Sequence, residues 1–346
     1  MRVGICGYPG SGKSTVFKAL APGASAERAG VAYGNIKVPD RRVEALSDIF
    51  SPKRKIFAEI TFVDVGGASG RPDTGAFPPE VVQTMRSVDV IAHVVRGFEN
   101  PMLVKPPDPA RDHDIFDDEL NLLDLQIIER RTDRFSRENK KGAEVTVNAR
   151  CQEHLETGKA LRSLSLSEDD LATLSGIQLL SLKPLITLYN LSEESWADPA
   201  TESLRQTTAR SDNEVSMALC GSIEIEIASL PAEDQAEFLE GLGLGEPARD
   251  EFIRAAYRLL DLISFLTAGP DECRAWPIQR GTPAKRAAGK VHSDIERGFI
   301  RAEVYRLEDL QEHGSEAALK SAGKMHLEGK DYIIQDGDVV NYRFNV

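Results

Sequence analysis

The sequence has no long apolar run, no paired cysteines and no excess of positive charge. Among its 346 residues there is no stretch of about 18 apolar residues, which excludes a membrane-spanning helix. The four cysteines lie far apart without a Cys-x-x-Cys pair, which argues against a zinc site or a disulfide framework and fits a reducing cytosol. The net charge of −13 disfavours a protein that coats nucleic acid with its whole surface, but it allows a local basic patch.

The chain also lacks an apolar signal core at its N-terminus, an internal repeat and a low-complexity tract. An apolar content of 41% with 28% charged residues is ordinary for a globular protein and too apolar for general disorder. The length is sufficient for two or three domains. We therefore expect a cytoplasmic globular protein without a targeting peptide and without a membrane partner.

Five apolar runs alternate with helical stretches in the first part of the chain. They are RVGIC (2–6), EITFVDVGG (59–67), DVIAHVVRGF (89–98), LITLYN (185–190) and EVSMALCG (214–221). Short runs that are apolar on both faces and are separated by helices are typical of a mostly parallel sheet. The sequence therefore predicts an α/β fold. In this fold His93, within the third run, is expected to be a packed, hydrogen-bonded core residue rather than a catalytic one.

The alternation stops between the third and fourth runs. After a proline-rich loop the sequence is helical in pattern to about residue 180, with Leu120, Leu123 and Ile127 on one helix face. Its segment 125–150, the basic arm, carries seven Lys or Arg residues against four acids. We expect a helical insertion whose arm is either a binding surface or a solvated face with paired charges.

The C-terminal part, 281–346, has a different pattern. FIRAEVYRL, DYIIQD and VVNYRFNV are predicted strands around the helical EAALKSAGK, and Asp336-Gly337-Asp338 is a predicted tight turn. We expect a small α+β module here.

Residues 7–15 carry the clearest functional pattern. Gly7-Tyr8-Pro9-Gly10-Ser11-Gly12-Lys13-Ser14-Thr15 fits G-x-x-x-x-G-K-[ST], with a predicted strand before it and a helix after it. Glycines let backbone N–H groups face a phosphate, and the start of the helix adds a partial positive charge. In this phosphate-binding loop (P-loop), Lys13 is predicted to contact the β- and γ-phosphates and Ser14 to ligate Mg²⁺.

A second pattern follows the second predicted strand. Asp64-Val65-Gly66-Gly67 reads as D-x-x-G, in which the carboxylate supports Mg²⁺ and the Gly67 N–H faces a γ-phosphate. The predicted catalytic residues are therefore Lys13, Asp64 and Gly67, and the predicted metal-binding residues are Ser14 and Asp64.

An ordered series of motifs resembles the YchF/Obg-like ATPase family of P-loop proteins. It includes GYPGSGKSTVFKAL, FVDVGG, DVIAHVVRGFENP, LNLLDLQIIERR, AAGKVHSDIERGFIRAEV and GKDYIIQDGDVVNYRFNV, and it covers nearly the whole chain. The resemblance implies a discontinuous P-loop G domain (residues 1–110 and 181–280), a helical insertion (111–180) and a C-terminal TGS domain of the β-grasp type (281–346). It also implies binding of ATP in preference to GTP, slow hydrolysis, and association with ribosomes, ribosomal RNA or translation factors. Because the protein as a whole is acidic, we expect that contact to be made through the basic arm, with the TGS-like domain as a second surface.

The turn after the fourth run bears on the choice of base. Guanine readers carry Asn-Lys-x-Asp there, and this chain carries Asn190-Leu191-Ser192-Glu193. The longer Glu193 does not reproduce the bidentate carboxylate contact to guanine, Leu191 replaces the lysine that covers the base, and Asn190 can still contact the base edge. Adenine is therefore favoured over guanine. The end of the fifth run completes the predicted nucleotide-binding set with Cys220, Gly221 and Ser222.

Two departures from the family pattern leave alternatives open. No threonine occurs from residue 16 to residue 60, so the first switch lacks the usual Mg²⁺ ligand, and no glutamine stands next to the D-x-x-G motif. The alternatives are a GTP-binding protein, or a hydrolysis-deficient module that binds RNA or ribosomes in response to nucleotide. A small-metabolite kinase is disfavoured, because such an enzyme has no reason to carry the 281–346 module.

Overall fold

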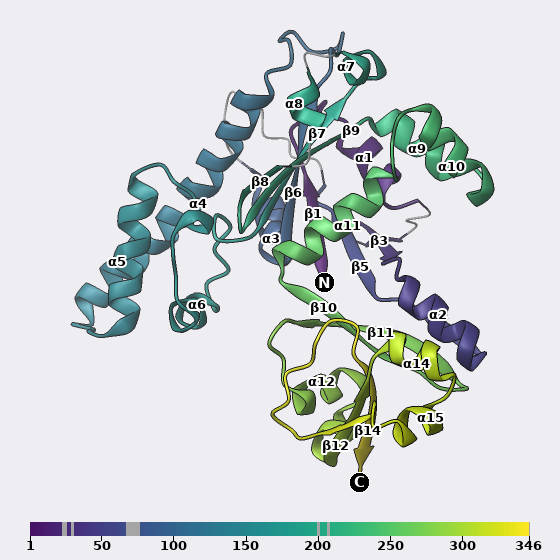
Figure 1. The fold of residues 1–346 in the computed structure, drawn as a ribbon. Helices are drawn as coiled ribbons and strands as arrows, with labels where there is room; N and C mark the ends of the chain where they lie inside the picture. Colours follow the sequence, from purple (N-terminus) through teal and green to yellow (C-terminus); the bar gives the residue numbers. More distant parts are fainter. Residues whose placement is uncertain (23–25, 29–30, 67–76, 199–200, 206–207, 346) are drawn as a thin grey trace. The chain divides into compact units, whose positions relative to one another are not determined.

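The computed structural model describes residues 1–22, 26–28, 31–66, 77–198, 201–205 and 208–345. The chain forms two compact units, each built from two segments. The first unit comprises Met1–Ile36 and Thr61–Leu259, and the second comprises Lys37–Ile60 and Leu260–Val346. Figure 1 shows both, coloured along the sequence.

The first unit contains an eight-stranded sheet in the order β2-β3-β5-β1-β6-β7-β9-β8. Its strands are β1 (Arg2–Cys6), β2 (Ala26–Arg28), β3 (Val31–Lys37), β5 (Glu59–Asp64), β6 (Val90–Gly97), β7 (Leu185–Leu191), β8 (Thr208–Ser211) and β9 (Glu214–Leu219). The five predicted runs form β1, β5, β6, β7 and β9, which pair in parallel. The mostly parallel α/β sheet is confirmed, with antiparallel β2–β3 and β8–β9 pairs at its edges.

The helices of this unit are α1 (Lys13–Leu20), α3 (Pro79–Arg86), α4 (Pro109–Arg137), α5 (Ala143–Glu156), α6 (Glu168–Leu174), α7 (Glu193–Ala197), α8 (Glu202–Arg205), α9 (Gly221–Ser229), α10 (Ala232–Gly241) and α11 (Ala248–Leu259), with a 3₁₀ turn at Leu161–Ser163. Helices α3 and α4 pack on one face of the sheet and α11 packs on the other. Successive side chains of a strand point to opposite faces of the sheet. In β5, Phe62 therefore packs against Phe252 of α11, and Val63 packs in the apolar cluster on the other face, beside α3 and α4.

The segment between β6 and β7 contains no strand, as predicted. Helices α4 and α5 form a hairpin at the side of the sheet (Figure 1), held by an apolar cluster that includes Ile128, Val147 and Cys151. The Asn148 amide also donates to the Ile128 carbonyl, at 3.1 Å. The boundaries 111 and 180 of a separate inserted domain stay a prediction, because this hairpin belongs to the first compact unit.

The second unit contains a six-stranded sheet in the order β13-β12-β14-β10-β11-β4. Its strands are β4 (Arg54–Ile56), β10 (Leu262–Thr267), β11 (Glu272–Gln279), β12 (Phe299–Tyr305), β13 (His326–Glu328) and β14 (Val339–Phe344). Its helices are α2 (Arg41–Phe50), α12 (Ala284–Val291), α13 (Ser293–Arg297), α14 (Leu307–His313) and α15 (Glu316–Ser321). The β-grasp assignment stays a prediction.

The C-terminal segment of this unit starts at Leu260 and includes β10, which pairs with β14, and β11, which pairs with β4. The domain boundary at residue 281 stays a prediction. The segment DYIIQD forms only a single bridge, from Ile333 to Pro283, rather than a strand. The carboxylate of Asp338 accepts hydrogen bonds from the Gln335 N–H and the Tyr332 hydroxyl, which closes this segment into the predicted turn around Gly337. Among the described residues, no helix is long and apolar enough to span a membrane.

Candidate functional site

The P-loop lies between the end of β1 and the start of α1. Gly12 precedes the helix with φ +82°, and a Cβ at this position would overlap the Asn190 side-chain amide. Glycine is therefore required here both for its backbone conformation and for space. The Ser11 N–H donates to the Tyr8 carbonyl at 3.1 Å, so the loop is closed by its own backbone. This places the first N–H groups of α1 at the open end of the loop.

Lys13, the first residue of α1, forms an ion pair with Asp64 at the end of β5. Both side chains are mostly buried. Strands β1 and β5 are parallel neighbours, so their carboxyl ends bring the P-loop and the D-x-x-G motif together. Ser14 is exposed on the first turn of α1, next to Lys13. Two of the three predicted catalytic residues are thus adjacent. The third, Gly67, lies outside the described residues.

Asn190, at the end of β7, fastens two loops together. Its amide nitrogen donates to the Ser11 carbonyl at 3.0 Å, and its amide oxygen accepts from the Gly221 N–H at 3.2 Å. The side chain is buried among these partners. Asn190 therefore positions the P-loop through its contacts with the protein backbone. Its contact with the edge of a base stays a prediction.

Glu193 and Ser222 also lie close together. The Ser222 hydroxyl donates to Glu193 Oε1 at 3.1 Å, and the Cys220 thiol is 3.2 Å from the same hydroxyl. These contacts join the turn after β7 to the start of α9. Leu191, which stands in place of the lysine of guanine readers, is 2% exposed and packs in an apolar cluster with Val95. Its membership of the nucleotide-binding set stays a prediction.

The other predicted P-loop residues fall into two groups. Pro9 and Gly10 are exposed at the tip of the loop. Tyr8 is buried, and its ring lies parallel to Phe77 with 6.0 Å between ring centroids. Tyr8 therefore joins the loop to the core through its side chain. The Thr15 side chain lies against Gly221, where an added Cβ would be 3.0 Å from it.

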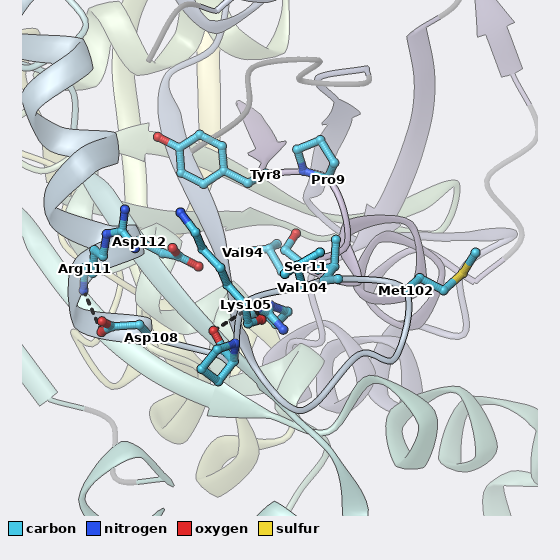
Figure 2. A pocket seen from close by; sticks show the side chains of 13 residues that line it. Tyr8, Pro9, Ser11, Val94, Met102, Val104, Lys105, Asp108, Arg111 and Asp112 are labelled. Atoms are coloured by element: carbon cyan, nitrogen blue, oxygen red, sulfur yellow. Dashed lines mark hydrogen bonds between the residues drawn. The ribbon is translucent and has the colours of Figure 1, made fainter. Parts of the chain in front are cut away.

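A cavity of about 550 Å³ adjoins the P-loop. Figure 2 shows Tyr8 and Pro9 above the other lining residues, Met102 at the right, and Asp108, Arg111 and Asp112 at the start of α4 at the left. Ser11, Val104 and Lys105 also line the cavity. Met102 is 91% exposed at the tip of the loop that follows β6.

Arg96, which no sequence motif singled out, anchors this loop. Arg96 is buried in β6, and its guanidinium donates to the carbonyls of Phe98, Lys105 and Pro106 at 3.4, 2.8 and 3.0 Å. An arginine near the end of a mostly apolar strand was the available signal, because a buried guanidinium requires several acceptors.

Cys6 lies directly beneath the P-loop but is not a reactive thiol. Its thiol donates to the Ala92 carbonyl at 3.5 Å, and burial raises the pKa of Cys6 to about 12. The thiolate that nucleophilic chemistry requires is therefore absent at neutral pH. No group of three or more His, Cys, Asp or Glu side chains suited to a metal occurs in the part of the chain that the structure describes.

Comparison with known proteins agrees with this geometry. A family profile described as "50S ribosome-binding GTPase" matches residues 2–133, and the YchF-GTPase_C profile, described as "Protein of unknown function (DUF933)", matches residues 262–345. The chain is 38% identical over its full length to "Ribosome-binding ATPase YchF" of Haemophilus ducreyi, covering 99% of that protein. The chain belongs to the YchF family. The YchF protein of Bacillus subtilis is 37% identical, with both chains fully covered.

A solved structure of the YchF family has the same fold. The Schizosaccharomyces pombe YchF GTPase superposes with a TM-score of 0.84 at 26% sequence identity, over 99% of this chain and 97% of that one. The family resemblance and the P-loop α/β fold predicted from the sequence are therefore confirmed.

Proposed function

We propose that this protein is an Mg²⁺-dependent nucleoside triphosphatase that prefers ATP, hydrolyses it slowly and associates with ribosomes. The observation that carries the proposal is the meeting of the P-loop, Asp64 and the strand ends of β7 and β9 around the first turn of α1. Relatives of similar length are named as ribosome-binding ATPases, which supports both halves of the proposal.

The triphosphate would bind at the backbone N–H groups of the P-loop. Lys13 then exchanges its contact with Asp64 for the β- and γ-phosphates, which releases the carboxylate. The start of α1 contributes its partial positive charge to the same phosphates. The ion pair thus holds Lys13 close to its functional position before nucleotide binds.

The donor set fits Mg²⁺. The exposed Ser14 hydroxyl and the Asp64 carboxylate are oxygen donors on adjacent elements, and Mg²⁺ takes few protein ligands because phosphates and water supply the rest. When bound, the ion neutralises charge on the phosphates. The roles of Ser14, Asp64 and Gly67 remain proposals.

The turn after β7 supports adenine over guanine. Glu193 already accepts a hydrogen bond from Ser222, and Leu191 is packed in the core. The turn therefore offers neither the free short carboxylate nor the covering lysine of a guanine reader. Cys220 at the N-cap of α9, together with Gly221 and Ser222 in its first turn, completes the set that we propose for the base.

Calorimetric titration with Mg-ATP and Mg-GTP tests the proposal. We expect Mg-ATP to bind more tightly, and Lys13→Ala to remove most of the affinity, because a charge-assisted contact of this kind contributes about 1.5–3 kcal/mol. Lys18→Ala, an exposed lysine in the last turn of the same helix, is the matched control. Unchanged affinity in a folded Lys13→Ala protein contradicts the P-loop assignment, and tenfold tighter GTP binding contradicts the base preference.

Single-turnover hydrolysis separates the proposal from its alternative, a module that binds nucleotide without useful hydrolysis. The missing threonine between residues 16 and 60 favours that alternative. Product formed at saturating protein supports a slow triphosphatase. Bound ATP that stays intact supports the binding module.

A further inference from the structure

Glu119 is a buried acid in an apolar part of the first unit. It lies on α4, on the helix face that includes Phe116, Leu120 and Leu123, and it is 6% exposed. These neighbours belong to the apolar cluster beneath the P-loop. A carboxylate in such a position costs free energy unless it is well hydrogen-bonded.

Only one of its two oxygens has a partner. Oε1 accepts a hydrogen bond from the Phe77 backbone N–H, whereas Oε2 is buried without a partner among the described residues. An apolar side chain here would pack in the cluster without this cost, so the acid is not explained by stability. Its contact with Phe77 is the remaining structural reason.

Phe77 connects α4 to the P-loop. It stands just before α3, in the connection that starts after Asp64 at the end of β5. Its ring lies parallel to Tyr8 of the P-loop at 6.0 Å and edge-on to Phe116 of α4 at 5.6 Å, measured between centroids. The Glu119 carboxylate fixes the backbone of this residue, and the two rings fix its side chain.

Titratable groups from the P-loop, β6 and α4 itself surround Glu119, and they include His113, whose ring lies 6.4 Å from that of His93. Burial raises the pKa of Glu119 to about 7, and the Phe77 N–H partly opposes this. From the P-loop, Tyr8 stays protonated, because burial and then the charge of Glu119 raise its pKa. From β6, His93 stays neutral, because burial lowers its pKa. On α4 itself, Asp112 has a pKa raised by burial, while Asp118 lies near Tyr8.

We propose that Glu119 is a positioning residue of the nucleotide site: its carboxylate holds Phe77 against Tyr8 and so couples α4 to the P-loop. The ionised acid accepts the Phe77 N–H strongly, since hydrogen bonds to charged acceptors are about twice as strong as neutral ones. Protonation weakens the bond and loosens Phe77. This inference rests on the proposed nucleotide binding.

Two variants test it in the full chain. Glu119→Leu fills the same apolar site but cannot accept the hydrogen bond, and Glu119→Gln keeps a neutral acceptor at every pH. Glu129→Gln, an exposed acid on the same helix, is the control. The readouts are the Kd of Mg-ATP from pH 6 to 8 and the amide hydrogen exchange of residues 77–86, corrected for intrinsic exchange.

We expect Glu119→Leu to weaken Mg-ATP binding about tenfold and to lower the protection of Phe77 by a similar factor. Wild type should bind more tightly as pH rises through about 7, beyond the change that ATP itself causes in the control. Glu119→Gln should lack this extra change. Wild-type affinity and protection in Glu119→Leu, or one pH profile shared by wild type and Glu119→Gln, overturns the inference.

The failure of the proposed function would look different. Wild-type protein that binds neither Mg-ATP nor Mg-GTP contradicts nucleotide binding, whereas the exchange measurement still decides whether Glu119 holds Phe77. Unchanged exchange in Glu119→Leu then overturns the inference by itself.

Discussion

The raised pKa of Glu119 also predicts how the stability of the protein depends on pH. The pKa of its side chain is about 7 in the folded protein against an ordinary value of 4.5, so between these values the folded state binds more protons than the unfolded state. This contribution to stability therefore falls as pH rises from about 4.5 to 7 and stays lost above that. The side chain of Glu119→Gln does not titrate. When the pH is raised from 5 to 8, the free energy of unfolding of Glu119→Gln should therefore rise relative to that of wild type by on the order of 2 kcal/mol.

Denaturant unfolding of both proteins at the two pH values measures this difference. Glu129→Gln should follow wild type, because Glu129 is exposed on the same helix. Parallel pH dependence of wild type and Glu119→Gln would show that the carboxyl titrates normally.

Residues whose roles depend on a short local pattern could be predicted from the sequence, whereas residues whose roles depend on long-range contacts could not. The P-loop was found because its spacing and its strand-helix context lie within one short segment. Glu119 and Arg96 were missed, because their roles depend on Phe77 and on a loop backbone that only the folded chain brings to them. For His93 the packing was predicted correctly, but its ring nitrogens have no hydrogen-bond partner among the described residues, and the ring stacks on Phe116 at 3.8 Å instead.

At the scale of elements, some basic residues of the basic arm pack over an aromatic ring and others do not. Arg131, Arg134 and Lys140 lie over the Phe135 ring at 5.2, 5.5 and 5.2 Å, so part of their role is packing. Arg130, Arg137 and Lys141 are exposed around the same end of the hairpin. The second set is therefore the sharper probe of binding to ribosomal RNA.

We predict that reversing Arg130, Arg137 and Lys141 to Glu weakens co-sedimentation with ribosomes at least about tenfold and flattens its salt dependence. The reason is that each phosphate contact releases counterions. Mg-ATP affinity should not change. Lys159→Glu, a single reversal in the same insertion, is the control. If the triple variant co-sediments like wild type with the same salt slope, the arm is a solvated helix face and the C-terminal module becomes the surface to test.

At the scale of the whole molecule, the second unit depends on a segment far away in sequence. Strand β4 pairs in parallel with β11, and Arg42 of α2 forms an ion pair with Asp336 at 2.9 Å. Val43 and Leu46 of α2 are fully buried. The run of strands in 281–346 was visible in the sequence, but this partnership was not, because strand pairing between distant segments leaves no local pattern.

We predict that a fragment of residues 260–346 is less stable than the same fragment joined to residues 37–60 by a Gly-Ser linker. The longer protein restores the β4–β11 pair and covers the sheet with α2. A loss of about 2 kcal/mol or more in the short fragment corresponds to a Tm lower by roughly 10 °C. Circular dichroism on heating measures it. Equal melting temperatures would mean that 37–60 is only an attached segment.

The pairing of β4 with β11 also has a consequence for synthesis. Arg54 lies opposite Glu272, so the strand emerges from the ribosome roughly 200 residues before its partner. Because translation proceeds at about 5–20 residues per second, roughly 10 to 40 seconds pass before β11 is made. During this time Val43 and Leu46 of α2 are not covered by β11. During that interval the nascent chain carries an apolar helix face that a chaperone can bind. Slow codons before position 272 would lengthen the exposure and lower the yield of folded protein, while leaving the amino-acid sequence unchanged.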